Sequence, residues 1–251
     1  MTKEFGNLRI VEIELFSYCN RTCSFCPNSF IDRLSFNELL DIKIFKKIIK
    51  ELKSVNYSNY ISFSRYCEPL SHRDILDDRI KYIRKELPKS KLVLNTNGDY
   101  DWEGLDIDEL TIMDYDNNFS NKELKRIVRK NKPKLVRMMR LGKINNRAGS
   151  LDIKKKYIRD FPCYEPNYFI GIDYTGDVVP CCNIRSDINN HKPYVLGNVK
   201  DNTLEEIFNS EFTVKFRSDV NNLNFPDVCK SCSKEPGRYT SDNPNIMNRV
   251  S

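Results

Sequence analysis

Cysteines are the residues of this chain best suited to chemistry, because nine are present and seven of them fall into two spaced groups. The first group has the spacing Cys-x3-Cys-x2-Cys and consists of Cys19, Cys23 and Cys26. The second group is more widely spread and consists of Cys163, Cys181, Cys229 and Cys232. An odd number of thiols cannot all pair as disulfides. In a chain without a secretory signal, short regular spacings indicate metal binding or catalysis.

The first group lies within residues 17–27 (SYCNRTCSFCP), directly after a strand-like segment. Three thiolates on one loop can bind three irons of a cubane cluster, which leaves the fourth iron open to a chelating ligand. A zinc ion needs four ligands, and the nearest histidine in the sequence is His72. The spacing therefore predicts an iron–sulfur cluster with one open iron.

The elements that must position these cysteines alternate between strand-like and helix-like segments. Strands are expected at 8–16, 59–64, 91–95, 108–113 and 134–139, and helices at 38–53, 73–87 and 120–130. Such alternation predicts an α/β fold with a parallel sheet, whose chemistry collects at the carboxyl ends of the strands. After about residue 142 the pattern changes, with a hairpin expected at 168–181 and a helix at 203–220. We expect a partial barrel over 1–150, a smaller domain over 151–236 and a flexible tail over 237–251.

Composition narrows the class of protein further. The 251 residues carry a formal net charge of +6, and 39% of them are hydrophobic, which is ordinary for a globular chain. Lysines and arginines are scattered, so we expect a solvated surface and no nucleic-acid partner. No segment has the roughly 18 apolar residues of a membrane helix, and no secretory signal precedes the first strand. These features predict a cytoplasmic protein without a membrane partner.

The cysteine loop resembles that of the radical S-adenosylmethionine (SAM) superfamily, whose Cys-x3-Cys-x-aromatic-Cys motif follows the first strand of a partial (β/α)6 barrel. The resemblance implies that the first cysteine group binds a [4Fe-4S] cluster and that the open iron of this cluster binds SAM. Reductive cleavage of SAM would then yield a 5′-deoxyadenosyl radical, which abstracts a hydrogen atom from the substrate.

The same resemblance implies SAM contacts at the ends of later strands. Glu68 and Pro69 match the family's Gly-Gly-Glu-Pro motif, although Tyr66 and Cys67 replace its glycines. The Glu68 carboxylate would pair with the ammonium group of SAM. The other implied contacts are Phe25, Asn95, Asn97 and Asp114. For the asparagines and Asp114, ordinary turn chemistry is the alternative.

The second cysteine group resembles the first half of the SPASM domain, the auxiliary-cluster region of many radical SAM enzymes. The resemblance rests on Gly176, five residues before Cys181, and on the closing pair Cys229 and Cys232. No cysteine follows, so the chain resembles the truncated twitch form, in which the four cysteines bind one auxiliary [4Fe-4S] cluster. A zinc ion bound by the four thiolates is the alternative. Cys182 would face away from Cys181 in an extended segment, and we expect it to pack as a small apolar residue.

The whole layout resembles the twitch enzymes that oxidise a secondary alcohol with the auxiliary cluster as electron acceptor. The segments that carry this resemblance are 96–99 (TNGD), 146–149 (NRAG) and 196–198 (LGN). By this resemblance Arg147 lies at the substrate, where a permanently charged guanidinium is better suited to binding than to proton abstraction. We therefore predict a radical SAM oxidoreductase that dehydrogenates a small-molecule alcohol. The mildly basic chain suits an acidic flavodoxin- or ferredoxin-type electron donor.

Two other functions stay open. Related enzymes also modify ribosomal peptides, and the Cys67 thiol lies where it could return a hydrogen atom to a carbon radical, as a peptide epimerase requires. About seven residues precede the first expected strand, so we expect no leader-peptide-binding domain there, which favours a small substrate. A non-catalytic iron–sulfur sensor is disfavoured by the complete first cysteine motif and by Glu68.

Overall fold

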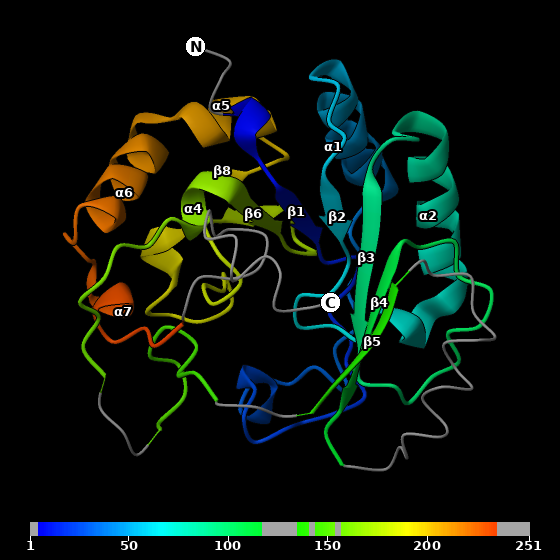
Figure 1. The fold of residues 1–251 in the computed structure, drawn as a ribbon, viewed down its shortest axis with the longest axis horizontal. Coiled ribbons are helices and arrows are strands. Elements are labelled where there is room, and N and C mark those ends of the chain that lie inside the picture. Colours follow the sequence, from blue (N-terminus) through cyan, green and yellow to red (C-terminus); the bar gives the residue numbers. More distant parts are fainter. Residues whose placement is uncertain (1–4, 117–134, 141–143, 154–156, 235–251) are drawn as a thin grey trace.

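The computed structural model describes residues 5–116, 135–140, 144–153 and 157–234 (Figure 1). The helix expected at 120–130 and the tail expected at 237–251 lie outside these residues. Among the helices of the described residues, none has both the length and the apolar composition that crossing a membrane requires.

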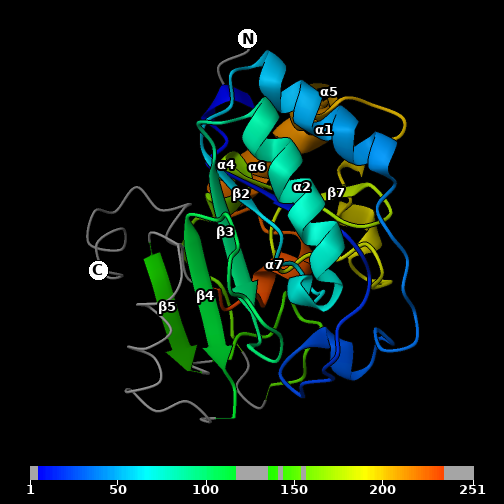
Figure 2. The same cartoon turned by 90° about the vertical axis from the view of Figure 1, so that its right-hand side faces the viewer.

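A parallel sheet forms the centre of the first part of the chain. Its strands follow the order β5-β4-β3-β2-β1, and each neighbouring pair is parallel. They are β1 (Ile10–Ile13), β2 (Tyr60–Ser62), β3 (Lys91–Thr96), β4 (Glu109–Asp114) and β5 (Leu135–Arg140). In Figure 2 the arrowheads of β3, β4 and β5 point towards the lower edge of the sheet, where the segment after β1 also lies. The carboxyl ends of the strands therefore meet at the edge that holds the first cysteine group.

The helices α1 (Ile42–Ser54) and α2 (Arg73–Glu86) cover one face of this sheet (Figure 2). The buried side chains of α1 recur at steps of three and four residues, and they are Phe45, Ile48, Ile49 and Leu52. α1 starts later than the expected helix at 38–53, because Asp41 caps its first turn and Leu39 forms a bridge with Phe16.

The sheet continues past β1 into the second half of the chain. β6 (Phe169–Ile172) pairs with β1 in parallel, and β7 (Asp177–Val179) and β8 (Gly197–Asn198) follow in antiparallel order. The expected hairpin is confirmed, with a turn at Gly176, whose φ of +92° favours glycine. The expected partial α/β barrel with an attached auxiliary domain is also confirmed. In the described residues, five parallel strands precede residue 141 and the sixth, β6, comes from the auxiliary region.

The helix expected at 203–220 is divided into α5 (Leu204–Asn209) and α6 (Glu211–Asn221). Ser210 separates them because its ψ of 150° is extended and its side chain accepts a hydrogen bond from the Thr213 N–H, which caps α6. The remaining described helices are short: α4 (Glu165–Tyr168), α7 (Asp227–Lys230), and the 3-10 turns η1 (Phe5–Asn7), η2 (Pro27–Ser29), η3 (Pro69–His72) and η4 (Lys192–Tyr194).

Candidate active site and auxiliary cluster site

The loop between β1 and α1 carries the first cysteine group at the carboxyl edge of the sheet. The Cys19 N–H donates to the Arg33 carbonyl at 3.0 Å, and the Cys26 N–H donates to the Cys23 carbonyl at 2.9 Å. All three cysteines are half-buried and line one cavity of about 330 Å³. A cavity of this size is typical of a small-ligand site.

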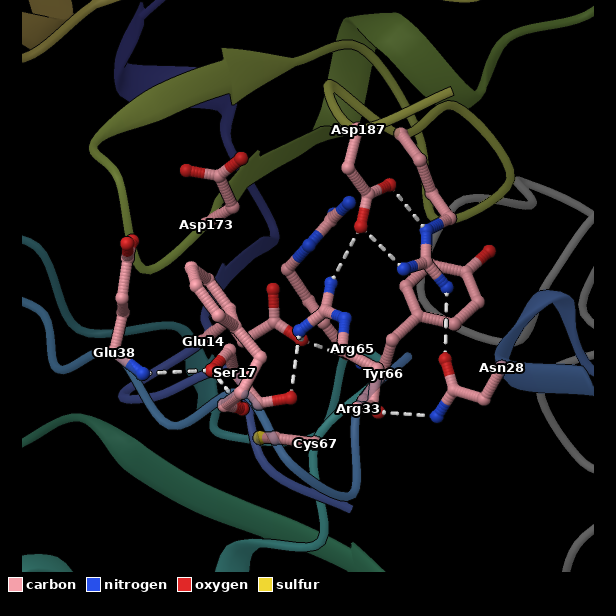
Figure 3. Close-up of polar contacts among 12 residues, drawn as sticks. Glu14, Ser17, Asn28, Arg33, Glu38, Arg65, Tyr66, Cys67, Asp173 and Asp187 are labelled. Carbon is pink, nitrogen blue, oxygen red and sulfur yellow. Dashed lines mark hydrogen bonds and ion pairs between the residues drawn. The ribbon is translucent and has the colours of Figure 1, made fainter. Parts of the chain in front are cut away.

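Buried charges hold this loop against the sheet (Figure 3). Glu14, directly after β1, accepts hydrogen bonds from the Arg33 guanidinium at 3.3 Å and from the Tyr66 N–H at 3.0 Å. Arg33 also donates to the Ser17 carbonyl at 2.9 Å and to the Asp187 carboxylate at 2.8 Å. Because Asp187 belongs to the auxiliary region, these bonds tie the cysteine loop to that region.

Arg185 extends the same network to the far end of the loop. Its guanidinium donates to Asp187 at 2.6 Å and to the Asn28 side-chain oxygen at 3.0 Å, and it lies over the Tyr66 ring at 4.0 Å. The Asn28 amide donates in turn to the Tyr66 carbonyl at 2.9 Å. Burial acts to raise the pKa of Asp187, but its bonds to Arg185 and Arg33 outweigh burial and lower the pKa to about 2.

Glu68, the implied partner of the SAM ammonium group, lines the cavity and is 2% exposed. Its carboxylate accepts hydrogen bonds from the Thr96 hydroxyl at 2.7 Å and the Asn97 N–H at 2.8 Å. The Leu70 N–H is a third donor, at 3.1 Å, and burial raises the pKa of Glu68. A carboxylate accepts about four hydrogen bonds, so the site has capacity for one more donor, such as an ammonium group.

Phe25, Asn95 and Asn97, three further implied SAM contacts, line the same cavity. The Phe25 ring lies against the Tyr115 ring, with 4.8 Å between their centroids. The Asn97 amide donates to the Asn20 side-chain oxygen in the cysteine loop at 2.8 Å, which ties the end of β3 to that loop. Four of the five implied SAM contacts therefore lie around one cavity.

Asp114 is the fifth, and it does not line the cavity. Its neighbours Met113 and Tyr115 do, because successive side chains of an extended segment point to opposite faces. Asp114 is 2% exposed and lies on the other face of β4. The alternation of β4 was the signal that could have identified Met113 and Tyr115 in the sequence.

Arg147, the implied substrate contact, lines the cavity from the segment after β5. Its φ is +49°, and φ is +54° at Ala148 and +80° at Gly149. Left-handed backbone costs about 1–3 kcal/mol at each non-glycine residue and is concentrated at functional sites. Among the bonds that hold the segment, the Ala148 carbonyl accepts from His191 at 3.0 Å, and the Arg147 guanidinium donates to the Asn183 oxygen at 3.4 Å.

A buried charged pair in the cavity wall was missed by the sequence reasoning. Glu12 on β1 and Arg65 after β2 are 3.5 Å apart, and their side chains are 9% and 1% exposed. The Glu12 Oε2 and the Arg65 Nε and Nη1 have no hydrogen-bond partner in the described part of the chain. Burial raises the pKa of Glu12 to about 7, although Arg65 acts to lower it. A glutamate inside a strand that is otherwise apolar was the available signal.

Two thiols outside the cluster motifs also line this cavity. Cys67 is 8% exposed, packs with the hydrophobic core and donates to the Phe63 carbonyl with a sulfur–oxygen distance of 3.6 Å. Cys182 lines this cavity while Cys181 lines the second one, so their expected opposite orientation is confirmed. The expectation that Cys182 packs among apolar residues is corrected, because its side chain forms part of the cavity wall.

The second cysteine group surrounds a separate, enclosed cavity. All four members line it, and they are Cys163, Cys181, Cys229 and Cys232. Burial raises the pKa of Cys181 well above its usual range and that of Cys229 to about 12. Such thiols ionise only when a positive metal centre offsets the cost of a buried thiolate. Their convergence from three distant segments fits an iron–sulfur cluster.

The surroundings of the auxiliary cavity carry compensating positive charge. The Lys234 ammonium pairs with the Glu165 carboxylate at 2.5 Å, and both residues line the cavity together with Arg159. The cysteines of each group line a cavity and do not converge on the position of a single metal ion. Among the described residues, no three Cys, His, Asp or Glu side chains are close enough to hold a single metal ion.

Comparisons with known proteins agree with this arrangement. The family model described as the radical SAM superfamily matches residues 13–136, and SPASM, an iron–sulfur cluster-binding domain, matches residues 163–233. The S-adenosyl-L-methionine-dependent 2-deoxy-scyllo-inosamine dehydrogenase of Niallia circulans is 27% identical over 245 residues. That alignment covers 89% of this chain and 92% of the relative.

Solved structures share the fold. BtrN, in complex with AdoMet and 2-DOIA, superposes with a TM-score of 0.72 at 21% identity, over 91% of this chain and 94% of BtrN. Streptococcus suis SuiB bound to the precursor peptide SuiA superposes with a TM-score of 0.54 at 14% identity, over 90% of this chain and 70% of SuiB. Each of the two matched family regions contains one complete cysteine group. The chain therefore belongs to the radical SAM superfamily, as an enzyme that uses SAM and a [4Fe-4S] cluster and carries a SPASM-type domain for an auxiliary iron–sulfur cluster.

Proposed function

We propose that this enzyme dehydrogenates a small-molecule secondary alcohol and that the auxiliary cluster accepts one of the two electrons. The observation that carries the proposal is the segment 181–183, which forms a wall shared by the two cavities. Cys181 and Asn183 line the auxiliary cavity, and Cys182 lines the cavity of the first cysteine group. A substrate beside Arg147, which is bonded to Asn183, would thus lie across this wall from the auxiliary cysteines.

The first cavity would bind SAM and the alcohol together. When bound, the reduced [4Fe-4S] cluster and SAM supply a 5′-deoxyadenosyl radical that takes the carbon-bound hydrogen atom. Cys19, Cys23 and Cys26 would hold the cluster, and Glu68 would accept a hydrogen bond from the SAM ammonium group. Phe25, Asn95 and Asn97 would orient the rest of SAM and keep water away from the radical.

Completing the oxidation requires a proton acceptor, and we assign that role to Glu12. Loss of the hydrogen atom leaves a carbon radical that still carries its hydroxyl group. Conversion of this radical to a ketone would release the hydroxyl proton, which the Glu12 carboxylate would accept, and one electron, which an oxidised auxiliary cluster held by Cys163, Cys181, Cys229 and Cys232 would accept. Glu12 lines the cavity, its Oε2 accepts no hydrogen bond within the described residues, and a pKa of about 7 suits a base that works near neutral pH. Arg147 and Arg65 stay protonated and would bind substrate oxygens instead.

The Niallia circulans relative supports the choice of substrate class. Its name states that it dehydrogenates 2-deoxy-scyllo-inosamine, and the two chains align over most of both lengths. The cavity suits such a polar compound, because Glu12, Arg65 and Arg147 supply both acceptors and donors. We therefore propose an aminocyclitol or a related polyhydroxylated alcohol as substrate.

A peptide substrate with Cys67 as hydrogen-atom donor has less support. The Cys67 thiol donates to the Phe63 carbonyl and packs in the hydrophobic core, whereas a hydrogen-atom donor must approach the substrate radical. We further propose a flavodoxin- or ferredoxin-type electron donor and a cytoplasmic location. The location is supported by the nine cysteines, which form no disulfide within the described residues.

The test is anaerobic turnover of the reconstituted, reduced full chain with SAM and 2-deoxy-scyllo-inosamine, followed by mass spectrometry. We expect a product two mass units lighter and about one 5′-deoxyadenosine for each product. Cys23→Ala should form neither. Formation of 5′-deoxyadenosine without any lighter product across a series of aminocyclitols would contradict the proposal. A peptide product of unchanged mass that gains deuterium from deuterated water would instead favour the epimerase.

A further inference from the structure

Asn183 lies in the wall between the two cavities and is 1% exposed. Its amide nitrogen donates to the Cys232 sulfur, with 3.6 Å between Nδ2 and Sγ. Its oxygen accepts from the Arg147 guanidinium at 3.4 Å and from the Cys182 thiol at 3.9 Å. One buried side chain therefore contacts an auxiliary cysteine on one side and two residues of the first cavity on the other.

These contacts determine which way the amide points. The two ends of an amide have nearly the same shape, so its orientation follows from its partners. A guanidinium can only donate hydrogen bonds, and Arg147 therefore requires the Asn183 oxygen on its side. The NH2 group is then left facing the Cys232 sulfur.

A donor in this position has a defined effect on a cluster bound by Cys232. Hydrogen bonds to cluster sulfurs are among the factors that set the reduction potential. A hydrogen bond stabilises the more electron-rich sulfur of the reduced cluster, so it raises the potential. The positive charge of Arg147 polarises the same amide, and linked hydrogen bonds in a buried site strengthen each other.

We propose that Asn183 is a positioning residue that raises the reduction potential of the auxiliary cluster and transmits the charge of Arg147 to it. The use of this cluster as an electron acceptor rests on the proposed function, whereas its potential does not. In an alcohol oxidation, a higher potential favours transfer of the second electron from the substrate radical. The electron enters the auxiliary cluster, and the proton leaves separately to Glu12.

The experiment measures the midpoint potential of the auxiliary cluster by an EPR-monitored redox titration without substrate. The full chain carries Cys23→Ala, so that the auxiliary cluster is the one observed. Asn183→Asp keeps the size and the acceptor of the side chain but replaces the N–H donor with a negative oxygen, so we expect the potential to fall. Asn183→Leu and Arg147→Leu should lower it by smaller amounts.

The matched control is Asn167→Leu, because the Asn167 amide bonds to Asn221 at 3.2 Å and, unlike the Asn183 amide, donates to no cysteine within the described residues. This control should keep the potential of the parent chain. Iron content measured for each variant shows whether the cluster is present. An Asn183→Asp potential equal to that of the control would overturn the proposal.

A second measurement needs no substitution at Asn183. In the reduced auxiliary cluster, the amide proton near Cys232 should give a hyperfine coupling in electron–nuclear double resonance, and this coupling should disappear in deuterated water. Absence of an exchangeable coupling would overturn the proposal even if Asn183→Asp binds no iron. Dehydrogenation is measured separately in the chain that keeps Cys23: a shifted potential without any dehydrogenation in that chain would refute the proposed function and leave the role of Asn183 intact. Normal dehydrogenation together with an unshifted potential would support the proposed function and refute the role of Asn183.

Discussion

Proton transfer to Glu12 can be separated from the radical step by Glu12→Gln, which keeps the shape of the side chain and removes its basicity. Burial raises the pKa of Glu12 to about 7. A group with that pKa is ionised to about one tenth at pH 6 and about nine tenths at pH 8. We therefore expect dehydrogenation to accelerate roughly tenfold between these pH values and to level off above them.

The charges around Glu12 come from four segments of the chain. Arg65 and Lys234 lower its pKa, whereas Glu14, directly after β1, and Glu165, at the start of α4, raise it. Burial is the largest influence, and it favours the neutral form. The expected pH dependence therefore arises mainly from the burial of Glu12 and not from any one neighbouring charge.

The assay follows ketone and 5′-deoxyadenosine formation together across pH 5.5–8.5. Loss of a positioned base typically costs about 10²–10⁴ in rate, so Glu12→Gln should form ketone that much more slowly and without the rise near pH 7. Because the carbon-bound hydrogen is removed first, 5′-deoxyadenosine should still form and exceed the ketone. Glu51→Gln is the control, since Glu51 is a half-buried glutamate on α1 outside the cavity. A Glu12→Gln variant with the parent's pH profile and product ratio would refute the assignment.

Three other substitutions test the first cluster, the buried network and the substrate contact. Cys23→Ala should abolish 5′-deoxyadenosine formation and lower the iron content from about eight to about four per chain, because two thiolates hold the cubane poorly. Asp187→Asn leaves Arg33 and Arg185 without their shared carboxylate. The Asp187 pKa of about 2 lies below its usual 3.8, so its contribution of about 2 kcal/mol is present above pH 4 and lost as the pH falls towards 2. Thermal melts at pH 7 and pH 3 should therefore show a stability deficit in the variant that shrinks with acid. Arg147→Lys keeps the charge but loses the planar guanidinium, and the KM for the alcohol should rise roughly tenfold to hundredfold, measured by steady-state kinetics.

The strands and helices of the first part were predictable because their signals are local. Buried residues of α1 recur at helical steps, and the expected strands differ from β2, β3 and β4 by only a few residues. The division between α5 and α6 was missed, since the backbone of Ser210 depends on its cap for Thr213 and not on hydrophobic spacing. The position of β6 beside β1 was also not predictable, because strand order is a non-local property.

Within the site, too, the features with a local sequence signal were predictable and those that depend on distant segments were not. Glu68 was identified by its place beside Pro69, and the structure shows what the motif does not, namely that the end of β3 supplies two of its three hydrogen-bond donors. Asp114 was inferred from its position at a strand end, but the alternation of β4 turns it away from the cavity. Cys182 was assigned to apolar packing, because the cavity on its side becomes visible only after the two regions have packed together.

By itself, the sequence determined the chemistry, because the spacings of Cys19, Cys23 and Cys26 and of the second cysteine group are covalent properties of the chain. Tertiary structure alone decided how that chemistry is controlled. The Glu12–Arg65 pair, the Asp187 network and the Asn183 contact each join segments that are far apart in sequence. Their energies and pKa values arise from burial, and burial exists only once the parallel sheet and the auxiliary region have closed around them.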